Sequence, residues 1–166
     1  MRTCGAAVIA VLLLLSGCGR GAEQAERRSA AGAALETRAI ASGIIADPAD
    51  LDPVGAYATE TDRICIVPQA GSYRVGASID YGEGQNCVAR GTASGQATIT
   101  FDLGDDCRFD ARYDGTRIVF PATLPGTCAR RCVGRTTMAA LSAARLSGAV
   151  AEARSMVGVD NEVLCD

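Results

Sequence analysis

The sequence of 166 residues contains no histidine, lysine or tryptophan, and its 16 basic residues are all arginine. Without histidine the chain lacks the base of a Ser-His-Asp or Cys-His catalytic set, a histidine metal ligand and a histidine pH switch. Without lysine it cannot form a Schiff base, a Ser-Lys dyad or a Walker-type phosphate clamp. The sequence therefore predicts a protein that is not an enzyme, with no catalytic residues, no cofactor and no metal.

Aromatic residues and positive charge are also scarce. The chain has four tyrosines and three phenylalanines, and its formal net charge is −3. Proteins that bind nucleic acid by charge need a basic surface, and those that bind single strands also need aromatic faces on which bases stack. The sequence therefore predicts no nucleic-acid partner.

The N-terminus carries a short apolar run, residues 6–15, directly after a positively charged end. The run is too short to span a bilayer, which takes about 20 residues, and is typical of a secretion signal. The motif Leu-Ser-Gly-Cys at residues 15–18 resembles the lipobox of bacterial lipoproteins. The resemblance implies a signal peptide over residues 1–17, diacylglycerol on the sulfur of Cys18, and acylation of the amine that cleavage exposes. The alternative is an ordinary secretory signal cleaved nearby.

Lipidation at Cys18 would place the protein on the cell envelope. Two or more acyl chains at one residue anchor stably, because each buried methylene contributes roughly 0.8 kcal/mol. In Gram-negative lipoproteins an aspartate after the lipid-bearing cysteine commonly retains the protein in the inner membrane. Gly19 therefore favours the outer membrane, with the protein facing the periplasm.

The rest of the chain divides by composition into two parts. Residues 18–42 are rich in Ala, Glu and Arg and have little apolar surface, which is typical of a flexible tether with at most a frayed helix. Residues 43–166 are predicted to form one disulfide-rich β domain with a C-terminal helix. The apolar residues that precede its first predicted strand are expected to lie on its surface or to plug one end: Ile44, Ile45, Leu51, Val54 and Tyr57.

Apolar and polar residues alternate from Asp62 to about Leu124. This period of two predicts about six short antiparallel strands in a meander. The predicted fold class is therefore mainly β, a small antiparallel meander or barrel-like sheet, disulfide-stapled, with a C-terminal helix. One register is well specified, because placing Phe101 opposite Phe109 also sets Asp102 against Arg108.

The registers of the adjacent hairpins follow from their turn residues. Asp114-Gly115 is typical of a two-residue turn, which would place Phe109 opposite Phe120. A turn across residues 92–96 would place Cys87 near Phe101. These pairings would complete the inner face of the sheet.

Six cysteines remain once Cys4 leaves with the signal peptide and Cys18 carries lipid: Cys65, Cys87, Cys107, Cys128, Cys132 and Cys165. An even number in an oxidising envelope predicts three disulfides. The predicted strand directions place four of the six cysteines at the same end of the sheet: Cys87, Cys107, Cys128 and Cys132. We predict the pairs Cys87–Cys107, Cys128–Cys132 and Cys65–Cys165, and an exchange of partners among the four clustered cysteines satisfies the same argument.

Beyond Pro125 the alternation stops and alanine dominates. Apolar residues at helical spacing predict a helix over 147–156, whereas 135–146 could be a helix or a closing strand. The helix is expected to cover the open edge of the sheet.

Arg130 and Arg131 are the candidate partner-binding residues, because two cysteines flank them and guanidinium groups suit carboxylates and phosphates. The alternative is that they serve only solubility. The loop 80–86 has oxygen ligands but not the alternate-residue pattern of a calcium loop, so a solvated loop is favoured. Five aspartates supply carboxylate pairs that could serve general acid-base chemistry: Asp102, Asp105, Asp106, Asp110 and Asp114. The predicted register places Asp102, Asp110 and Asp114 on the outer face among arginines, so a solvated charge ladder is favoured.

The size, the anchor and the curled sheet broadly resemble the periplasmic lysozyme inhibitors of the lipoprotein type, from which no residue roles are carried over. The body more closely resembles uncharacterised small lipoproteins of Gram-negative bacteria across about residues 44–166. This likeness is carried by Asp62-Arg63-Ile64-Cys65, Asp80-Tyr81-Gly82 and Ile118-Val119-Phe120-Pro121. The resemblance implies no activity.

These observations predict a lipid-anchored interaction module. It would be held in the membrane through Cys18 and would bind or inhibit an envelope protein, or support an envelope assembly. The alternative is a lipocalin-like barrel that holds a small apolar ligand. Small residues on the predicted inner face would leave room for such a ligand: Ala77, Ala89, Gly91, Ala97 and Ala111.

Overall fold

The computed structural model describes residues 20–166, with side chains from residue 29 onward. The predictions for Cys4 and for the lipid anchor at Cys18 lie outside the described residues. The chain divides into two compact units, residues 1–45 and 46–166.

The described part of the first unit is a single helix, α2 (Arg20–Ala41), followed by a short turn. The sequence predicted a flexible tether with at most a frayed helix, whereas the structure has one continuous helix of 22 residues. Its alanine content accounts for this, since alanine has the highest helix propensity. Within residues 20–166, none of the helices combines the length and the apolar character needed to cross a membrane.

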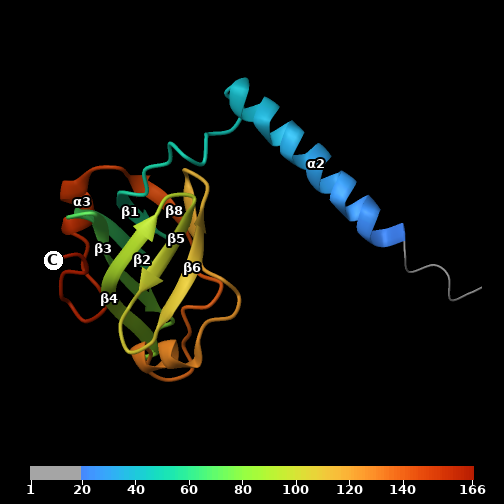
Figure 1. Ribbon diagram of the computed structural model, residues 1–166. Helices are drawn as coiled ribbons and strands as arrows, with labels where there is room; N and C mark the ends of the chain where they lie inside the picture. The colour runs from blue at the N-terminus through green and yellow to red at the C-terminus, as the bar shows by residue number, and fades with distance from the viewer. Residues whose placement is uncertain (1–19) are drawn as a thin grey trace, which may run out of the picture. The chain divides into compact units, whose positions relative to one another are not determined.

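The second unit is a closed barrel of eight antiparallel strands in which each strand pairs with the next and β1 pairs with β8 (Figure 1). The strands are β1 (Gly55–Ala58), β2 (Arg63–Gln69), β3 (Ser72–Asp80), β4 (Asn86–Gly95), β5 (Thr98–Asp102), β6 (Arg108–Tyr113), β7 (Arg117–Val119) and β8 (Ser142–Ser147). The predicted fold class is confirmed. Strand β1 was not predicted from the sequence; it lies before the first predicted strand. For residues 135–146 the sequence left a helix or a closing strand open, and the structure has the closing strand β8 there.

The strand registers confirm one predicted pairing and correct two. Phe101 lies opposite Phe109, as predicted. Phe109 does not lie opposite Phe120, because the β6–β7 turn is centred on Gly115 and Thr116, one residue later than predicted, and this shifts the register by two. Cys87 does not lie near Phe101 in register either: β4 continues to Gly95, so Phe101 pairs with Ala93. Both shifts are even, so the inward-facing side chains still face inward.

The segment before β1 closes one end of the barrel. Leu51 is buried, the Tyr57 hydroxyl donates to the Pro53 carbonyl at 2.7 Å, and the Tyr113 hydroxyl donates to the Asp52 carbonyl at 3.1 Å. Burial raises the pKa of Tyr57 above its ordinary value. Leu51, Val54 and Tyr57 therefore form the predicted plug at one end, whereas Ile44 and Ile45 are exposed.

Three disulfides hold the barrel. Cys65–Cys165 is confirmed, but the other two predicted pairs are wrong, because the bonds are Cys87–Cys132 and Cys107–Cys128. The physical reason is the path of the segment after β7, which crosses the end of the barrel drawn lowest in Figure 1, hereafter the lower end, through the 3-10 helix η1 (Gly126–Arg131). This segment passes the start of β6 first and then runs beside β4, and each of its cysteines bonds to the strand that it passes.

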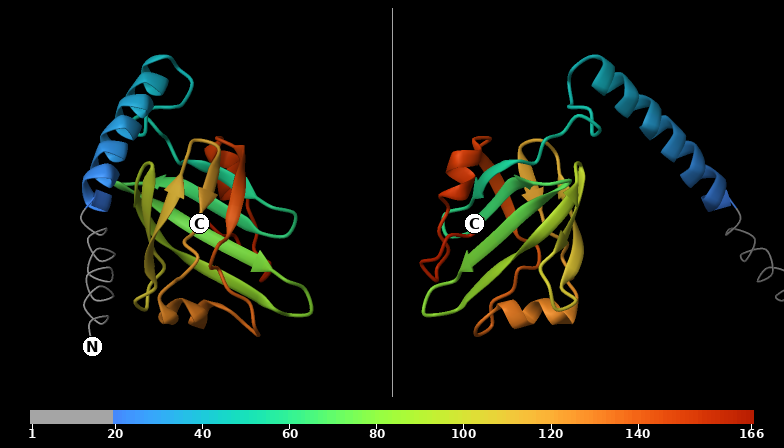
Figure 2. Two further views of the ribbon diagram at one scale, coloured as in Figure 1. Left: turned by 90° about the vertical axis from the view of Figure 1, so that its right-hand side faces the viewer. Right: turned by 60° about the vertical axis from the view of Figure 1, so that its left-hand side comes forward.

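The C-terminal segment forms an outer layer on the barrel. The short helix α3 (Val150–Arg154) and the residues after it lie along the outside of the first strands (Figure 2). Leu164 is buried against the strand residue Gly76, where a Cβ atom would collide with Leu164. The Ser78 hydroxyl also accepts a hydrogen bond from the Val159 N–H at 3.0 Å. The predicted helix therefore exists but is shorter, and it covers an outer face instead of an open edge, since closure leaves none.

Candidate binding surface

The interior of the barrel is filled by its own side chains. Phe101 stacks on Phe109 with ring centroids 5.5 Å apart, and Phe120 packs against both rings edge-on. The predicted small inner residues Ala77 and Ala111 are fully buried within the same cluster. An eight-stranded barrel can either fill itself with side chains or hold one small ligand. This barrel is filled with its own side chains, so the groups that can contact another molecule lie on its outer surface.

The two predicted partner-binding arginines lie on η1, at the lower end of the barrel. Arg131 is half-buried, and its guanidinium forms an ion pair with Asp105 at 2.7 Å. Arg130 is exposed and makes no side-chain hydrogen bond or ion pair with the described residues. The disulfides of Cys128 and Cys132 fix the backbone on either side of these residues. The structure therefore leaves only Arg130 of this pair with a guanidinium available to a partner.

The carboxylates of the strands serve structural roles. Asp102 pairs with Arg108 at 3.3 Å, and Asp110 accepts a hydrogen bond from the Thr100 hydroxyl at 2.7 Å. Burial raises the pKa of Asp114, but hydrogen bonds from Thr116 and from the Arg117 N–H outweigh it, so this pKa lies below its ordinary value. These contacts match a charge ladder and a turn.

The loop between β3 and β4 is organised by its own backbone. The Gly82 N–H donates to the Asp80 carboxylate at 2.8 Å, and the Tyr81 N–H donates to the Gln85 carbonyl at 2.9 Å. Within the described residues, the structure brings together no group of three or more Cys, Asp or Glu side chains that could hold a metal ion.

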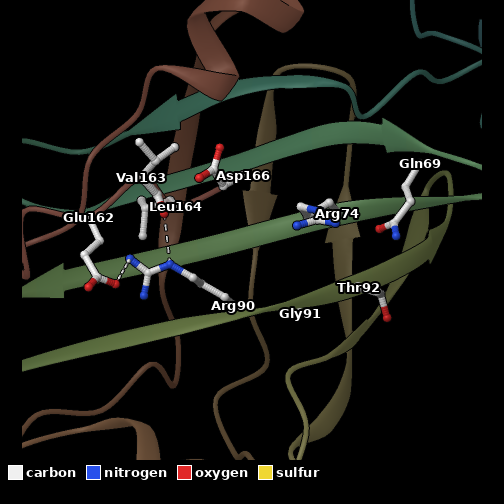
Figure 3. Close-up of a pocket in the computed structure, with 9 residues that line it drawn as sticks. All are labelled: Gln69, Arg74, Arg90, Gly91, Thr92, Glu162, Val163, Leu164 and Asp166. Carbon is white, nitrogen blue, oxygen red and sulfur yellow. Dashed lines mark hydrogen bonds and ion pairs between the residues drawn. The ribbon is translucent and has the colours of Figure 1, made fainter.

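A cleft of about 700 Å³ lies on the outer wall of the barrel, between the strands and the C-terminal segment (Figure 3). Its strand side is formed by β2, β3 and β4, and the end of the chain forms the opposite side. Nine residues line it: Gln69, Arg74, Arg90, Gly91, Thr92, Glu162, Val163, Leu164 and Asp166.

Arg90 anchors the C-terminal side of this cleft. Its guanidinium pairs with Asp160 at 2.9 Å and with Glu162 at 3.7 Å, and its Nε donates to the Val163 carbonyl at 3.0 Å. Burial raises the pKa of Asp160, but the hydrogen bonds from Arg90 and from the Glu162 N–H outweigh it and hold this pKa below its ordinary value. Arg90 is therefore held by the chain's own carboxylates and carbonyl through its Nε and one terminal nitrogen.

Arg74 occupies the middle of the outer wall, between Val67 of β2 and Thr92 of β4 in the strand register. It is exposed and makes no side-chain hydrogen bond or ion pair with the described residues. A second hollow, of about 320 Å³, is also bordered by Arg74 and continues to Arg154 of α3. Arg154 is exposed and likewise has no such partner within the described part of the chain. Two uncommitted guanidinium groups thus border neighbouring hollows.

Sequence reasoning missed this surface. In the alternating pattern Arg74 and Arg90 are ordinary outward-facing strand residues, and Glu162 is 72 positions after Arg90 in the sequence. The available signal was the predicted Cys65–Cys165 bond, because it places the end of the chain across the outer face of β2.

Comparisons with models of protein families, with curated proteins and with solved structures find no match to this chain.

Proposed function

We propose that the protein is a lipid-anchored binding module of the cell envelope, which contacts a protein partner through the outside of its barrel. The observation that carries the proposal is the packed interior, with Phe101 and Phe109 stacked at its centre. With the interior occupied, the exposed groups that can recognise another molecule are on the outer surface. Among them are the uncommitted guanidinium groups of Arg74, Arg130 and Arg154.

The anchor in this proposal rests on the sequence. The lipobox-like motif at residues 15–18 follows an apolar run of suitable length, and Cys18 would carry the lipid. The six cysteines bonded in three pairs fit the same location, because disulfides form and persist in an oxidising compartment. We propose the outer membrane, with the protein facing the periplasm, from Gly19.

The rigidity of the barrel supports a role in binding. Closure of the sheet and two disulfides fix the loops at its lower end, and a third fixes the C-terminal segment on its wall. A surface held in one conformation before association loses less conformational entropy when a partner binds. A preorganised surface of this kind can bind or inhibit an envelope protein, or support an envelope assembly.

The alternative is a lipocalin-like barrel that binds a small apolar molecule. Its support is the architecture, since lipocalins are also eight-stranded up-and-down antiparallel barrels. The buried aromatic cluster counts against it, because a ligand would have to displace rings that already pack against one another.

Membrane sedimentation tests the anchor. The wild-type protein should sediment with membranes, and Cys18→Ser should release it, because the thioether that carries the lipid cannot form. Cys4→Ser, in the proposed signal peptide, is the matched control and should leave sedimentation unchanged. Continued sedimentation of the Cys18→Ser protein would refute the anchor.

Site-specific crosslinking in living cells tests the binding role. A photoreactive residue is placed at exposed outer positions, such as Thr92 of β4 and Asp110 of β6. The proposal predicts a discrete crosslink to one envelope protein from some faces and not from others. Absence of a protein crosslink from every face, together with a small molecule that copurifies, would favour the alternative.

A further inference from the structure

We propose that the two hollows bordered by Arg74 and Arg154 bind an acidic segment of a protein partner, with its carboxylates on these two guanidinium groups. The inference rests on the proposed binding function and names the chemistry of the partner. Arg74 comes from β3 and Arg154 from α3, and both border the smaller hollow. Arg74 also borders the larger cleft (Figure 3). An extended ligand that occupies both hollows would therefore pass along Arg74.

The availability of these two arginines distinguishes them from their neighbour. Arg90, in the same cleft, already binds two carboxylates of its own chain, Asp160 and Glu162. Arg74 and Arg154 are exposed and make no side-chain hydrogen bond or ion pair with the described residues. A guanidinium presents five N–H donors in a planar fork that matches a carboxylate. Arg90 therefore already makes, within the chain, the guanidinium–carboxylate contact that Arg74 and Arg154 are free to make with a partner.

The remaining lining favours a peptide over an isolated anion. Gln69 and Thr92 place an amide and a hydroxyl at the border of the larger cleft, and Val163 adds half-buried apolar surface. Pro68 adds exposed apolar surface at the smaller hollow. Alternating polar and apolar contacts suit a segment in which acidic and apolar side chains are mixed.

Two acidic residues border the hollows. Glu162 lines the larger cleft, where it pairs with Arg90 at 3.7 Å. Asp166 lines both hollows and forms no ion pair with Arg74 or Arg154, so it is the acidic residue that opposes the proposed ligand directly. Residues 46–166 carry 11 arginines against 16 acidic residues, so a negatively charged segment is repelled by the barrel as a whole. Neutralising Asp166 should therefore strengthen binding, whereas neutralising Arg74 or Arg154 should weaken it.

The test is fluorescence anisotropy with a labelled peptide of alternating Glu and Leu, and with the same peptide carrying Gln for Glu. The protein is the mature chain with Cys18→Ser, secreted into the periplasm so that its disulfides form. The wild-type surface should bind the Glu peptide more tightly than the Gln peptide, and added salt should weaken this preference. The double variant Arg74→Gln/Arg154→Gln should bind the Glu peptide about tenfold more weakly.

Two control variants separate the proposed contact from a general effect of charge or of lost structure. Arg112→Gln removes an exposed arginine from β6, outside these hollows, and should leave the affinity unchanged. Asp166→Asn should tighten binding about twofold or more, which a general loss of structure cannot do. The inference is overturned if the double variant binds like the wild type, or if the Gln peptide binds as tightly as the Glu peptide.

A membrane headgroup is the other source of an anionic group. The assignment to a protein segment would be overturned if phosphatidylglycerol vesicles bound the wild type but not the double variant and the Glu peptide bound neither protein. In-cell crosslinking separates this inference from the function on which it rests. If the crosslink to an envelope protein persists in the double variant, the binding function stands and this location is wrong.

Discussion

Replacing Phe101 with alanine removes the ring at the centre of the barrel's aromatic cluster. Phe101 is fully buried, stacks on Phe109 at 5.5 Å and meets Phe120 edge-on at 5.0 Å between centroids. Truncation of a buried phenylalanine to alanine costs about 3 to 5 kcal/mol, because the apolar transfer energy is lost and a cavity remains. Each aromatic pair adds about 0.5 to 1.5 kcal/mol, so we expect a loss of about 4 kcal/mol or more.

The adjacent residue supplies the matched control. Asp102 lies on the same strand but faces outward, and its side chain is 46% exposed where it pairs with Arg108. An exposed ion pair contributes about 0 to 1 kcal/mol. The Asp102 carboxylate also accepts a hydrogen bond from the Gly104 N–H at 3.1 Å, which adds about 0.5 to 1.5 kcal/mol, so Asp102→Ala should cost clearly less than Phe101→Ala.

Urea denaturation of the oxidised, proposed mature chain with Cys18→Ser, followed by circular dichroism, measures the free energy of unfolding of both variants. The urea midpoint should fall strongly for Phe101→Ala and much less for Asp102→Ala, at similar slopes. Equal losses for the two variants would refute the inward facing of Phe101 and, with it, the register of β5 and β6.

Two further predictions concern the disulfides and pH. Removing the Cys65–Cys165 disulfide, which closes a loop of 100 residues, should destabilise the protein by about 4.7 kcal/mol. Removing Cys107–Cys128, which closes a loop of 21 residues, should cost about 3.3 kcal/mol. If urea denaturation gave the reverse order, the dependence on loop entropy would be wrong. The lowered pKa of Asp160 should stabilise the fold above the ordinary carboxyl pKa of about 3.9, and this contribution should vanish as pH falls through the lower folded value. In Asp160→Asn the free energy of unfolding should therefore fall less steeply as pH is lowered from about 6 to 2. An unchanged pH dependence in this range would contradict the ion pair with Arg90.

Alternation along the strands made much of the barrel predictable. Phe101 and Phe109 point inward whenever their polar neighbours point outward, so core and surface select one register. Turn chemistry was less informative, because Asp114-Gly115 fits a turn centred on either side of Gly115. A shift of one residue in the turn centre moves the register by two, and the facing pattern cannot detect it.

The unpredicted parts depend on contacts distant in sequence. Short β1, with four residues, has too few positions to show a period, and its place is set by pairing with β2 and β8. The pairing of the four clustered cysteines depends on the path of the segment after β7 across the barrel end. The smaller hollow requires Arg74, Arg154 and Asp166 to come together, and the docked C-terminal segment places the last two beside the strand that carries Arg74.

Native and denatured intact masses of the proposed mature chain with Cys18→Ser, which can carry no lipid at that position, test the central claim that the barrel interior is a packed core and not a ligand site. The protein is purified from an oxidising periplasm. The account predicts a native mass equal to that of the protein alone and a denatured mass lacking six hydrogens, two for each of three disulfides. A small molecule present at one copy per chain would contradict it and favour the lipocalin-like alternative. A deficit of fewer than six hydrogens would contradict the disulfide framework that holds the outer surface rigid.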